Sequence, residues 1–266
     1  MDSLKVWNII CCLWHFLNFI AALILAISIT KIGDFRMPLQ TSYVYWNKTG
    51  PATQVQEVAQ LPFAYVTVSV PLFAAFAHLW FAISNTYISN LLKKKNPIRW
   101  LEYAFSSSIM FVLIALLFGI YDLTSLITLF TINAVTMYFG YLMEILNTDD
   151  KILWHPFIVG CFLGAVQWGC LFSTLSSIGE DVPNFVWALT ASYAVLYGCF
   201  ALNMFWYFSK FEYFMCCYEK NEHSIGPSNK KFRASEKVYM ILSLVSKTLL
   251  LWLIFFGALQ PSRLNK

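Results

Sequence analysis

Seven stretches of the chain carry no charge, or only one, and are about as long as a membrane-spanning helix. A helix needs about 20 mainly apolar residues to cross the hydrocarbon core of a bilayer. The chain is 59% hydrophobic and 12% charged, whereas a soluble domain is only ~45–50% apolar, so a soluble protein is excluded. The sequence predicts an all-α membrane protein, a single domain over residues 1–266 with seven transmembrane helices. The stretches are residues 6–30, 61–92, 103–121, 123–143, 152–179, 182–209 and 238–262.

The first stretch and the distribution of positive charge predict how the bundle sits in the membrane. The first stretch has 25 residues, more than the ~7–15 of a signal peptide, so we expect it to remain as a helix. Lys and Arg favour cytoplasmic loops. Twelve fall on the side of the N-terminus and five on the opposite side. We expect an integral multi-pass protein of the plasma membrane, with its N-terminus inside and its C-terminus outside.

Two connections between the stretches are long, residues 31–60 outside and 210–237 inside. The outer one contains TSYVYW (41–46), which predicts a short strand or hairpin lying over the mouth of the bundle. Asn47-Lys48-Thr49 in the same loop is a glycosylation sequon. The inner loop has mixed charge, which favours a solvated surface, with docking of a cytoplasmic signalling partner as the alternative. No nucleic-acid partner is expected.

The seven cysteines lie within or at the edge of the predicted helices, so we expect no disulfide framework. Cys216 and Cys217 follow the sixth helix at the predicted cytoplasmic face. They are either small apolar residues that pack against their neighbours or sites of palmitoylation.

Lys247 is the only charged residue between Lys237 and Arg263. It lies ten positions along the helix from Lys237, which places it ~15 Å deep at ~1.5 Å per residue in a layer ~30 Å thick. A bare ammonium there costs at least ~2.5–3.5 kcal/mol, and an ionisable residue within the membrane is by default a functional candidate. A neighbouring group must therefore compensate the charge of Lys247.

The stretch NPIRWLEYAFSSSIM (96–110) supplies the candidate partner. Arg99, Glu102 and Ser106 are spaced so that they share one helix face. If that face points inward, Glu102 offers the negative charge that Lys247 needs. The alternative is a salt bridge between Arg99 and Glu102 at the membrane boundary. Ser243, one turn before Lys247, and Ser106 or Ser107 are candidates to hydrogen-bond the pair of charges.

A lysine in a dry pocket opposite a carboxylate suits one kind of chemistry. Burial favours the neutral amine, which attacks an aldehyde and forms a Schiff base. Once protonated, that Schiff base is a buried cation that Glu102 would stabilise. Within seven helices, with 24 Phe, 14 Tyr and 10 Trp to line an apolar slot, this chemistry indicates a retinal photoreceptor.

At these residues the chain resembles the heliorhodopsin family. The resemblance is carried by NPIRWLEYAFSSSIM, by EKVYMILSLVSKTLLLWLIFFGAL (236–259) and by FALNM (200–204). Ser243 also stands where microbial pump rhodopsins usually have Asp, four residues before the lysine. The chain departs from the family after FALNM, where Trp206-Tyr207 replaces a common Gln-Tyr pair. Because of this departure, the resemblance does not define the residues at the ring end of the retinal pocket or the absorption colour.

The resemblance implies a rhodopsin-like bundle with a cytoplasmic N-terminus and all-trans retinal bound covalently at Lys247. It implies that Glu102 is the counterion, that Ser243 and Ser107 lie near the Schiff base, and that the chain forms a homodimer with a small exterior sheet. Further residues expected at or beside the retinal site are Ser106, Tyr103, Asn203, His15 and His78. Glu144 matches a recurrent family carboxylate, or simply caps the cytoplasmic edge.

The function that the resemblance implies is a light sensor, not an enzyme, with a slow photocycle and no active pumping. A pump needs a proton acceptor and a proton donor on opposite sides of the Schiff base, and we expect no second acid on the last helix. The first alternative is a light-gated proton channel, with Arg99, Glu102, Glu144, Asp122, His15 and His78 as its candidate lining. The second is a seven-helix transporter or hormone receptor without a chromophore, in which Lys247 binds a substrate or an ion pair.

Overall fold

The computed structural model describes residues 3–148, 151–178, 182–209 and 227–257. Within these residues, seven helices are long and apolar enough to cross a membrane, as the sequence predicted. They are α1 (Ser3–Ser28), α3 (Phe63–Ile83), α5 (Pro97–Leu117), α6 (Leu123–Leu146), α7 (His155–Ile178), α8 (Asn184–Phe208) and α9 (Pro227–Gly257). The palmitoylation candidates Cys216 and Cys217 lie outside the described residues. The described cysteines are all free.

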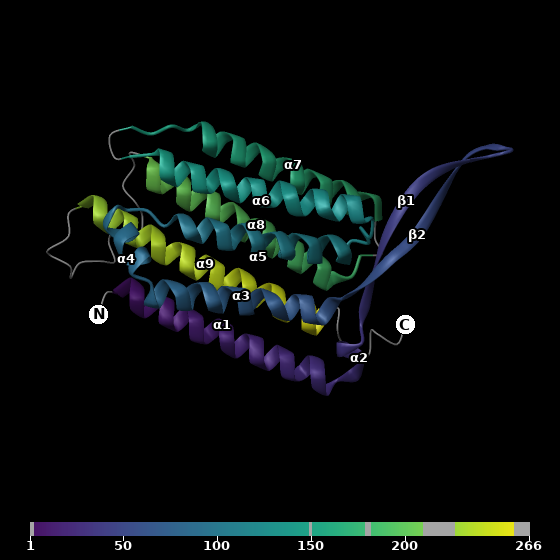
Figure 1. Cartoon of the computed structure of the whole chain (residues 1–266), viewed down its shortest axis with the longest axis horizontal. Helices are drawn as coiled ribbons and strands as arrows, with labels where there is room; N and C mark the ends of the chain where they lie inside the picture. The colour runs from purple at the N-terminus through teal and green to yellow at the C-terminus, as the bar shows by residue number, and fades with distance from the viewer. Residues whose placement is uncertain (1–2, 149–150, 179–181, 210–226, 258–266) are drawn as a thin grey trace.

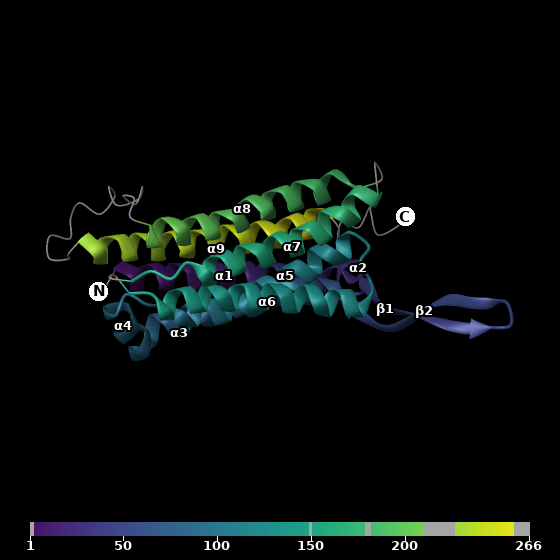
Figure 2. The same ribbon diagram turned by 90° about the horizontal axis from the view of Figure 1, so that it is seen from above.

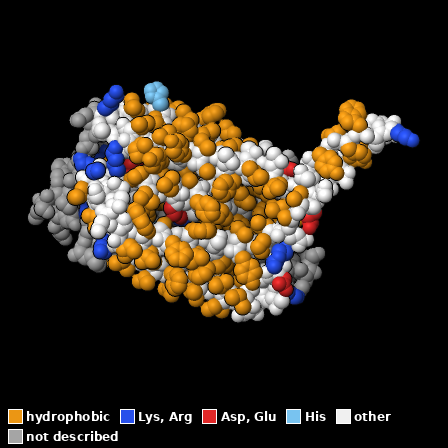
Figure 3. All heavy atoms as spheres, viewed as in Figure 1, with side chains coloured by type: hydrophobic (Ala, Val, Ile, Leu, Met, Phe, Trp, Pro, Cys, Tyr) orange, Lys and Arg blue, Asp and Glu red, His pale blue; other side chains and the backbone are white. Residues whose placement is uncertain are grey.

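The helices run side by side along the long axis of the molecule (Figures 1 and 2), and α1 begins at the end opposite to the end of α9. Hydrophobic side chains cover the face seen in Figure 3, while Lys and Arg gather near its ends. This distribution suits a protein that crosses a bilayer. The chain is therefore an integral multi-pass membrane protein.

Helix α5 lies at the centre of the bundle and positions the site. Its second half is apolar on every face, and Met110, Phe111 and residues 113–116 are all buried. A helix that is hydrophobic all round is surrounded by other elements, and α5 packs most closely against α6 and α3. Pro97 occupies the first turn of α5, where its missing N–H leaves no hydrogen bond unmade. Arg99, in the first turn of α5, is also buried, so the polar start of this helix faces neighbouring helices as well.

The second charge-free stretch forms two helices. Helix α3 ends at Ile83, and α4 (Asn85–Leu92) begins after Ser84, whose side chain accepts a hydrogen bond from the Tyr87 N–H at 3.4 Å. Ser is a favoured residue at this capping position because its oxygen satisfies a free N–H of the first turn. The chain thus turns at Ser84 before it enters α5.

The long connection between the first two membrane-length helices forms a long antiparallel hairpin of β1 (Arg36–Asn47) and β2 (Gly50–Pro62), preceded by the short α2 (Thr30–Gly33). The predicted strand at 41–46 is confirmed. Its predicted position over the bundle mouth is wrong, because the hairpin projects away from the helices (Figures 1 and 2). At the tip, Asn47 Oδ1 accepts hydrogen bonds from the Thr49 N–H and hydroxyl, and Gly50 has a φ of +122°. These local bonds and the glycine conformation form the turn that joins β1 to β2.

The base of the hairpin is joined to the start of α6. The Gln40 N–H donates to the Tyr121 carbonyl at 2.8 Å, and Asp122 caps α6 by accepting hydrogen bonds from the Ser125 N–H and hydroxyl at 2.8 and 2.9 Å. These bonds to the ionised carboxylate hold the pKa of Asp122 below its ordinary value. One capping residue therefore fixes both the first turn of α6 and the place where the hairpin leaves the bundle.

Candidate functional site

Lys247 on α9 and Glu102 on α5 form an ion pair inside the bundle. The distance from Lys247 Nζ to Glu102 Oε1 is 2.6 Å, and the two side chains are only 3% and 12% exposed. Lys247 Nζ also donates to Ser243 Oγ, one turn earlier on α9, at 3.0 Å. The Tyr103 ring lies 5.3 Å from Nζ, within range of a cation–π contact. The structure therefore places Lys247 against the carboxylate and the serine that the sequence indicated.

Arg99 pairs with other acids, although it lies one turn from Glu102. Its guanidinium bonds to Glu144 on α6 at 2.9 Å and to Glu236 on α9. The alternative prediction, a salt bridge between Arg99 and Glu102, is therefore not what forms. The expectation that the last helix has no second acid is also wrong, because α9 begins well before Lys247 and includes the buried Glu236.

The serines of α5 do not bond to the ion pair. Ser106 Oγ is buried without a hydrogen-bond partner. Ser107 Oγ donates to the Tyr103 carbonyl and accepts from the Asn133 amide, each at 2.6 Å. The expectation that Ser106 or Ser107 would hydrogen-bond the Lys247–Glu102 pair is therefore not met. Both serines do line the same cavity as Lys247.

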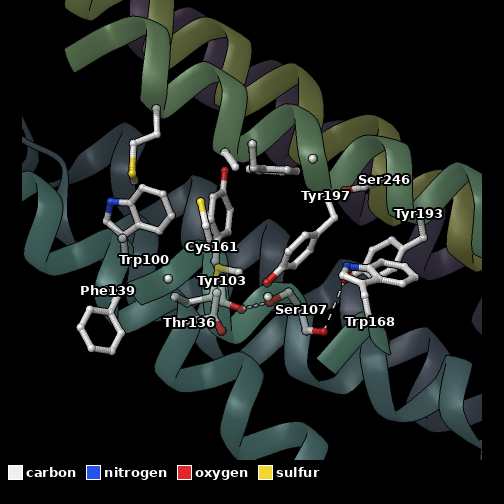
Figure 4. Close-up of a pocket in the computed structure, with 18 of the residues that line it drawn as sticks. Trp100, Tyr103, Ser107, Thr136, Phe139, Cys161, Trp168, Tyr193, Tyr197 and Ser246 are labelled. Carbon is white, nitrogen blue, oxygen red and sulfur yellow. Dashed lines mark hydrogen bonds between the residues drawn. The ribbon is translucent and has the colours of Figure 1, made fainter. Parts of the chain in front are cut away.

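This cavity has a volume of about 360 Å³ and lies between α5, α6, α7, α8 and α9. Figure 4 shows aromatic side chains around it, with Trp100 and Phe139 toward one side and Trp168 and Tyr193 toward the other. Ser243 and Lys247 form part of its wall. Its volume lies within the ~300–1,000 Å³ of small-molecule sites, which are mostly apolar with a few polar groups that set orientation. An amine in such a wall fits an apolar aldehyde of retinal's kind.

The other predicted residues lie around this cavity or away from it. Tyr103 lines it. His15 and His78 are stacked with ring centroids 5.6 Å apart, are buried, and are not among the lining residues. Asn203 bonds to Ser235 at 3.2 Å and is also outside the lining, so its expected contact with the cofactor stays a prediction.

The departure at Trp206-Tyr207 does not alter the cavity wall. Neither residue lines the cavity, and Trp206 is 43% exposed. The pair is therefore not part of the described cavity wall, and its effect on the ring end of the pocket and on the absorption colour stays a prediction. Aromatic residues of α7 and α8, among them Trp168 and Tyr193, form that wall instead.

Sequence reasoning missed a polar network beside the cavity. Gln167 on α7 donates to the Tyr197 hydroxyl at 2.7 Å and to Asn133 Oδ1 at 3.2 Å, and Asn133 continues to Ser107 on α5. Amides within charge-free stretches were the available signal, since a buried amide needs partners. The network joins four helices at the cavity wall.

Seven helices around a buried lysine define the rhodopsin class, and solved structures share this fold. Cyanorhodopsin from the cyanobacterium Tolypothrix sp. NIES-4075 matches with a TM-score of 0.65 at 11% identity, over 99% of this chain and 97% of that one. Cyanorhodopsin from Calothrix sp. NIES-2098 gives 0.61 at 10% identity, over 99% and 98%. A light-driven proton pump from Leptosphaeria maculans gives 0.63 at 12% identity, over 97% of each chain. Identities this low show the fold alone.

The sequence also identifies the family within this class. The family model described as Heliorhodopsin matches residues 4–259, and the chain belongs to the heliorhodopsin family. The resemblance seen in the sequence is thus confirmed. Membership makes the chain a rhodopsin-type photoreceptor with a retinal chromophore in a membrane. No curated protein sequence matches the chain.

Proposed function

We propose that this photoreceptor binds all-trans retinal at Lys247 with Glu102 as counterion, and that it is a light sensor with a slow photocycle and no ion pumping. When bound, retinal supplies the light-absorbing polyene and an aldehyde that condenses with an amine to a Schiff base. The observation that carries the proposal is the 2.6 Å contact between Lys247 Nζ and Glu102, made by a lysine in the wall of an apolar cavity.

Glu102 and Ser243 would hold a positive charge at the Lys247 nitrogen. A charged nitrogen in this position has lost its hydration, and an isolated buried charge is strongly unfavourable. Glu102 Oε1 supplies the opposite charge, and Ser243 Oγ accepts a hydrogen bond at 3.0 Å. Once Lys247 has condensed with retinal, its protonated nitrogen would keep a single N–H, which Glu102 Oε1 or Ser243 Oγ would accept.

The distribution of buried acids supports the absence of pumping. Glu144 and Glu236 both lie toward the N-terminal end of the bundle, next to Arg99 near the start of α5. Among the described residues, no buried acid lies between Lys247 and the hairpin end. A proton leaving the site toward the hairpin would therefore meet no buried carboxylate among the described residues before it reached Asp122 at the base of the hairpin.

A light-gated proton channel is the second candidate, and one row of buried polar groups favours it. His15 stacks on His78, His78 Nδ1 lies 2.8 Å from Asn8 Oδ1, and Asn8 Nδ2 donates to the Tyr87 hydroxyl at 3.2 Å. Tyr87 is on α4, at the N-terminal end of the bundle (Figure 1). A proton released near Lys247 could follow this row toward that end.

We further propose a homodimer in the plasma membrane, with the N-terminus cytoplasmic and a signalling partner on that side. The excess of Lys and Arg at the N-terminal side supports the orientation. The hairpin supports an intermolecular contact because Tyr43, Val44, Tyr45 and Trp46 are each at least 43% exposed. A contiguous exposed apolar patch indicates an interaction surface.

The test is the visible spectrum of the purified protein supplied with retinal. Wild type should form a visible pigment, and Lys247→Ala should form none because the only buried amine among the described residues is gone. Lys151→Ala, which removes an exposed lysine of the α6–α7 connection, is the control and should absorb like wild type. A wild-type visible band in Lys247→Ala would contradict the proposed attachment.

A further inference from the structure

Arg99, Glu144 and Glu236 form a second buried site, separate from the Lys247–Glu102 pair. It joins α5, α6 and α9 near the N-terminal end of the bundle, and the three side chains are 7%, 4% and 2% exposed. The guanidinium carbon of Arg99 lies 3.9 Å from the Tyr239 ring centroid. The ring of Trp100, whose indole N–H donates to Glu144, is 5.1 Å from the same carbon.

The charges of this cluster do not balance. Glu144 accepts hydrogen bonds from the Asn96 N–H, Trp100 and Arg99. Glu236 accepts from the Asn96 amide at 2.8 Å and from Arg99. Arg99 is the only cation paired with either carboxylate among the described residues, so two ionised glutamates would leave one buried negative charge without compensation.

Among the described residues, Arg99 is the only cation that lines the void beside the cluster. Tyr239 on α9 and Tyr207 on α8 line the same void and are neutral phenols near pH 7. Lys95, just before α5, donates its Nζ hydrogen to the Ile145 carbonyl at 2.8 Å. An uncompensated buried carboxylate takes up a proton in preference to remaining charged.

A second observation indicates that the cluster also binds water. The void is lined by Arg99, Glu144 and Glu236 together with residues of α8 and α9, and its volume is about 10 Å³, near the lower limit for one water molecule. Arg99 Nε is buried and has no hydrogen-bond partner among the described residues. A buried N–H donor without a partner indicates an acceptor that protein atoms do not provide.

We propose that this cluster is a proton-binding site, in which Glu144 and Glu236 share one proton while a single water in the void accepts the Arg99 Nε–H. Asn96 donates to both carboxylates, so either can carry the proton without loss of its neighbours. The site has net charge zero with the proton bound. Trp100 and Met204 line both this void and the cavity at Lys247, so the two sites are adjacent but distinct.

Infrared spectroscopy of protein labelled with ¹³C-glutamate tests the proton. At neutral pH, wild type should show the carbonyl band of one protonated glutamic acid per chain, with or without retinal, and the band should shift in D₂O. Glu144→Gln and Glu236→Gln should each abolish the band, because the remaining carboxylate then pairs with Arg99 alone. Glu57→Gln, which alters an exposed hairpin residue, is the matched control and should keep the band.

Two results would overturn the assignment. Absence of a labelled acid band in wild type at neutral pH rejects it without any variant, so a variant that fails to fold does not matter. Persistence of the band in both Gln variants places the proton elsewhere. The proposed water is tested by a crystal structure, which should show electron density for one water beside Arg99 Nε. A void without such density would refute the proposed water. Because the measurement does not need retinal, its outcome is independent of attachment at Lys247.

Discussion

Trp100 on α5 and Gly140 on α6 are in such close contact that only a hydrogen fits between them. A Cβ added at Gly140 would lie 2.4 Å from Trp100 Cε3, well inside van der Waals contact. The same indole lines the cavity at Lys247 and donates its N–H to Glu144. This contact therefore fixes one wall of the cavity and one hydrogen bond of the buried cluster.

Gly140→Ala should push Trp100 out of position and destabilise the pigment. Overpacking a close contact costs about 1–3 kcal/mol, and thermal loss of the visible band should occur at a correspondingly lower temperature. Gly169→Ala on α7 is the matched control, because its Cβ would meet nothing within 4 Å. Alanine in place of a helical glycine is neutral or stabilises by up to about 1 kcal/mol. Equal melting temperatures of Gly140→Ala and Gly169→Ala would show that the contact between Trp100 and Gly140 has room for a methyl group.

Removal of the Glu102 charge should shift the absorption of the pigment to the red. A carboxylate 2.6 Å from the Lys247 nitrogen stabilises positive charge there more in the dark state than in the excited state, in which the charge moves away. Acidification of wild type should therefore give a red shift as Glu102 is protonated. Glu102→Gln should be red-shifted at neutral pH and should lack this acid transition. A variant that titrates like wild type would reject Glu102 as the counterion.

Two buried serines of the same cavity should respond differently to replacement by alanine. Ser243→Ala removes the acceptor of a hydrogen bond from Lys247 Nζ, and loss of a bond to a charged group costs about 1.5–3 kcal/mol. Ser106→Ala removes a hydroxyl that has no partner and should be neutral or slightly stabilising. Thermal unfolding of the protein without retinal, followed by tryptophan fluorescence, measures both. Similar losses of stability would show that the hydrogen bond to Ser243 contributes nothing.

The sequence predicted Lys247 and Glu102 because each stands out against an apolar background. A charge at mid-membrane depth requires a partner, and helix spacing left few candidates. The same spacing argument failed for Arg99, because proximity along one helix cannot reveal acids that other helices bring closer. Glu144 and Glu236 reach Arg99 only through the packing of α6 and α9.

The features that the sequence did not reveal depend on tertiary packing or on weak local signals. Asn133 and Gln167 gave no spacing pattern, and their partnership arises where α6 meets α7. The break at Ser84 lies in a charge-free stretch, so the count of charges missed it, although Ser84 is a readable capping residue. The aromatic segment 41–46 indicated a strand, but it covers only part of β1. The direction of the hairpin is set at its base, where Gln40 meets Tyr121.

Asp122 should make the junction between the hairpin and α6 sensitive to acid. Its pKa is lowered by hydrogen bonds from the Ser125 N–H and hydroxyl, so its contribution to stability is present above the ordinary pKa of an aspartate. That contribution is lost as the pH falls through the lowered value. Asp122→Ala should lower the melting temperature at neutral pH but have little effect in strong acid. Asp122→Asn, which retains a capping oxygen, is the control. A pH-independent difference between Asp122→Ala and wild type would exclude this titration.

Illumination of cells that express the protein should not acidify or alkalinise the medium by pumping. The described residues provide buried acids on the N-terminal side of Lys247 and none toward the hairpin, so a proton released from the site has no carboxylate relay across the membrane. The measurement is extracellular pH with and without an uncoupler, and Lys247→Ala cells provide the light control. A light-dependent pH change that the uncoupler abolishes would overturn the absence of pumping.

Photocurrents at controlled voltage should separate the sensor from the channel. A sensor gives no steady current, whereas a channel gives one that reverses near the proton equilibrium potential. If current flows through the row of buried polar groups, His78→Phe should reduce it severalfold, because Phe cannot replace the contact between His78 and Asn8. His155→Phe, which alters the histidine at the start of α7, should leave the current unchanged. Current that persists in His78→Phe would place the path elsewhere, since neither ring nitrogen of the stacked His15 has a hydrogen-bond partner among the described residues.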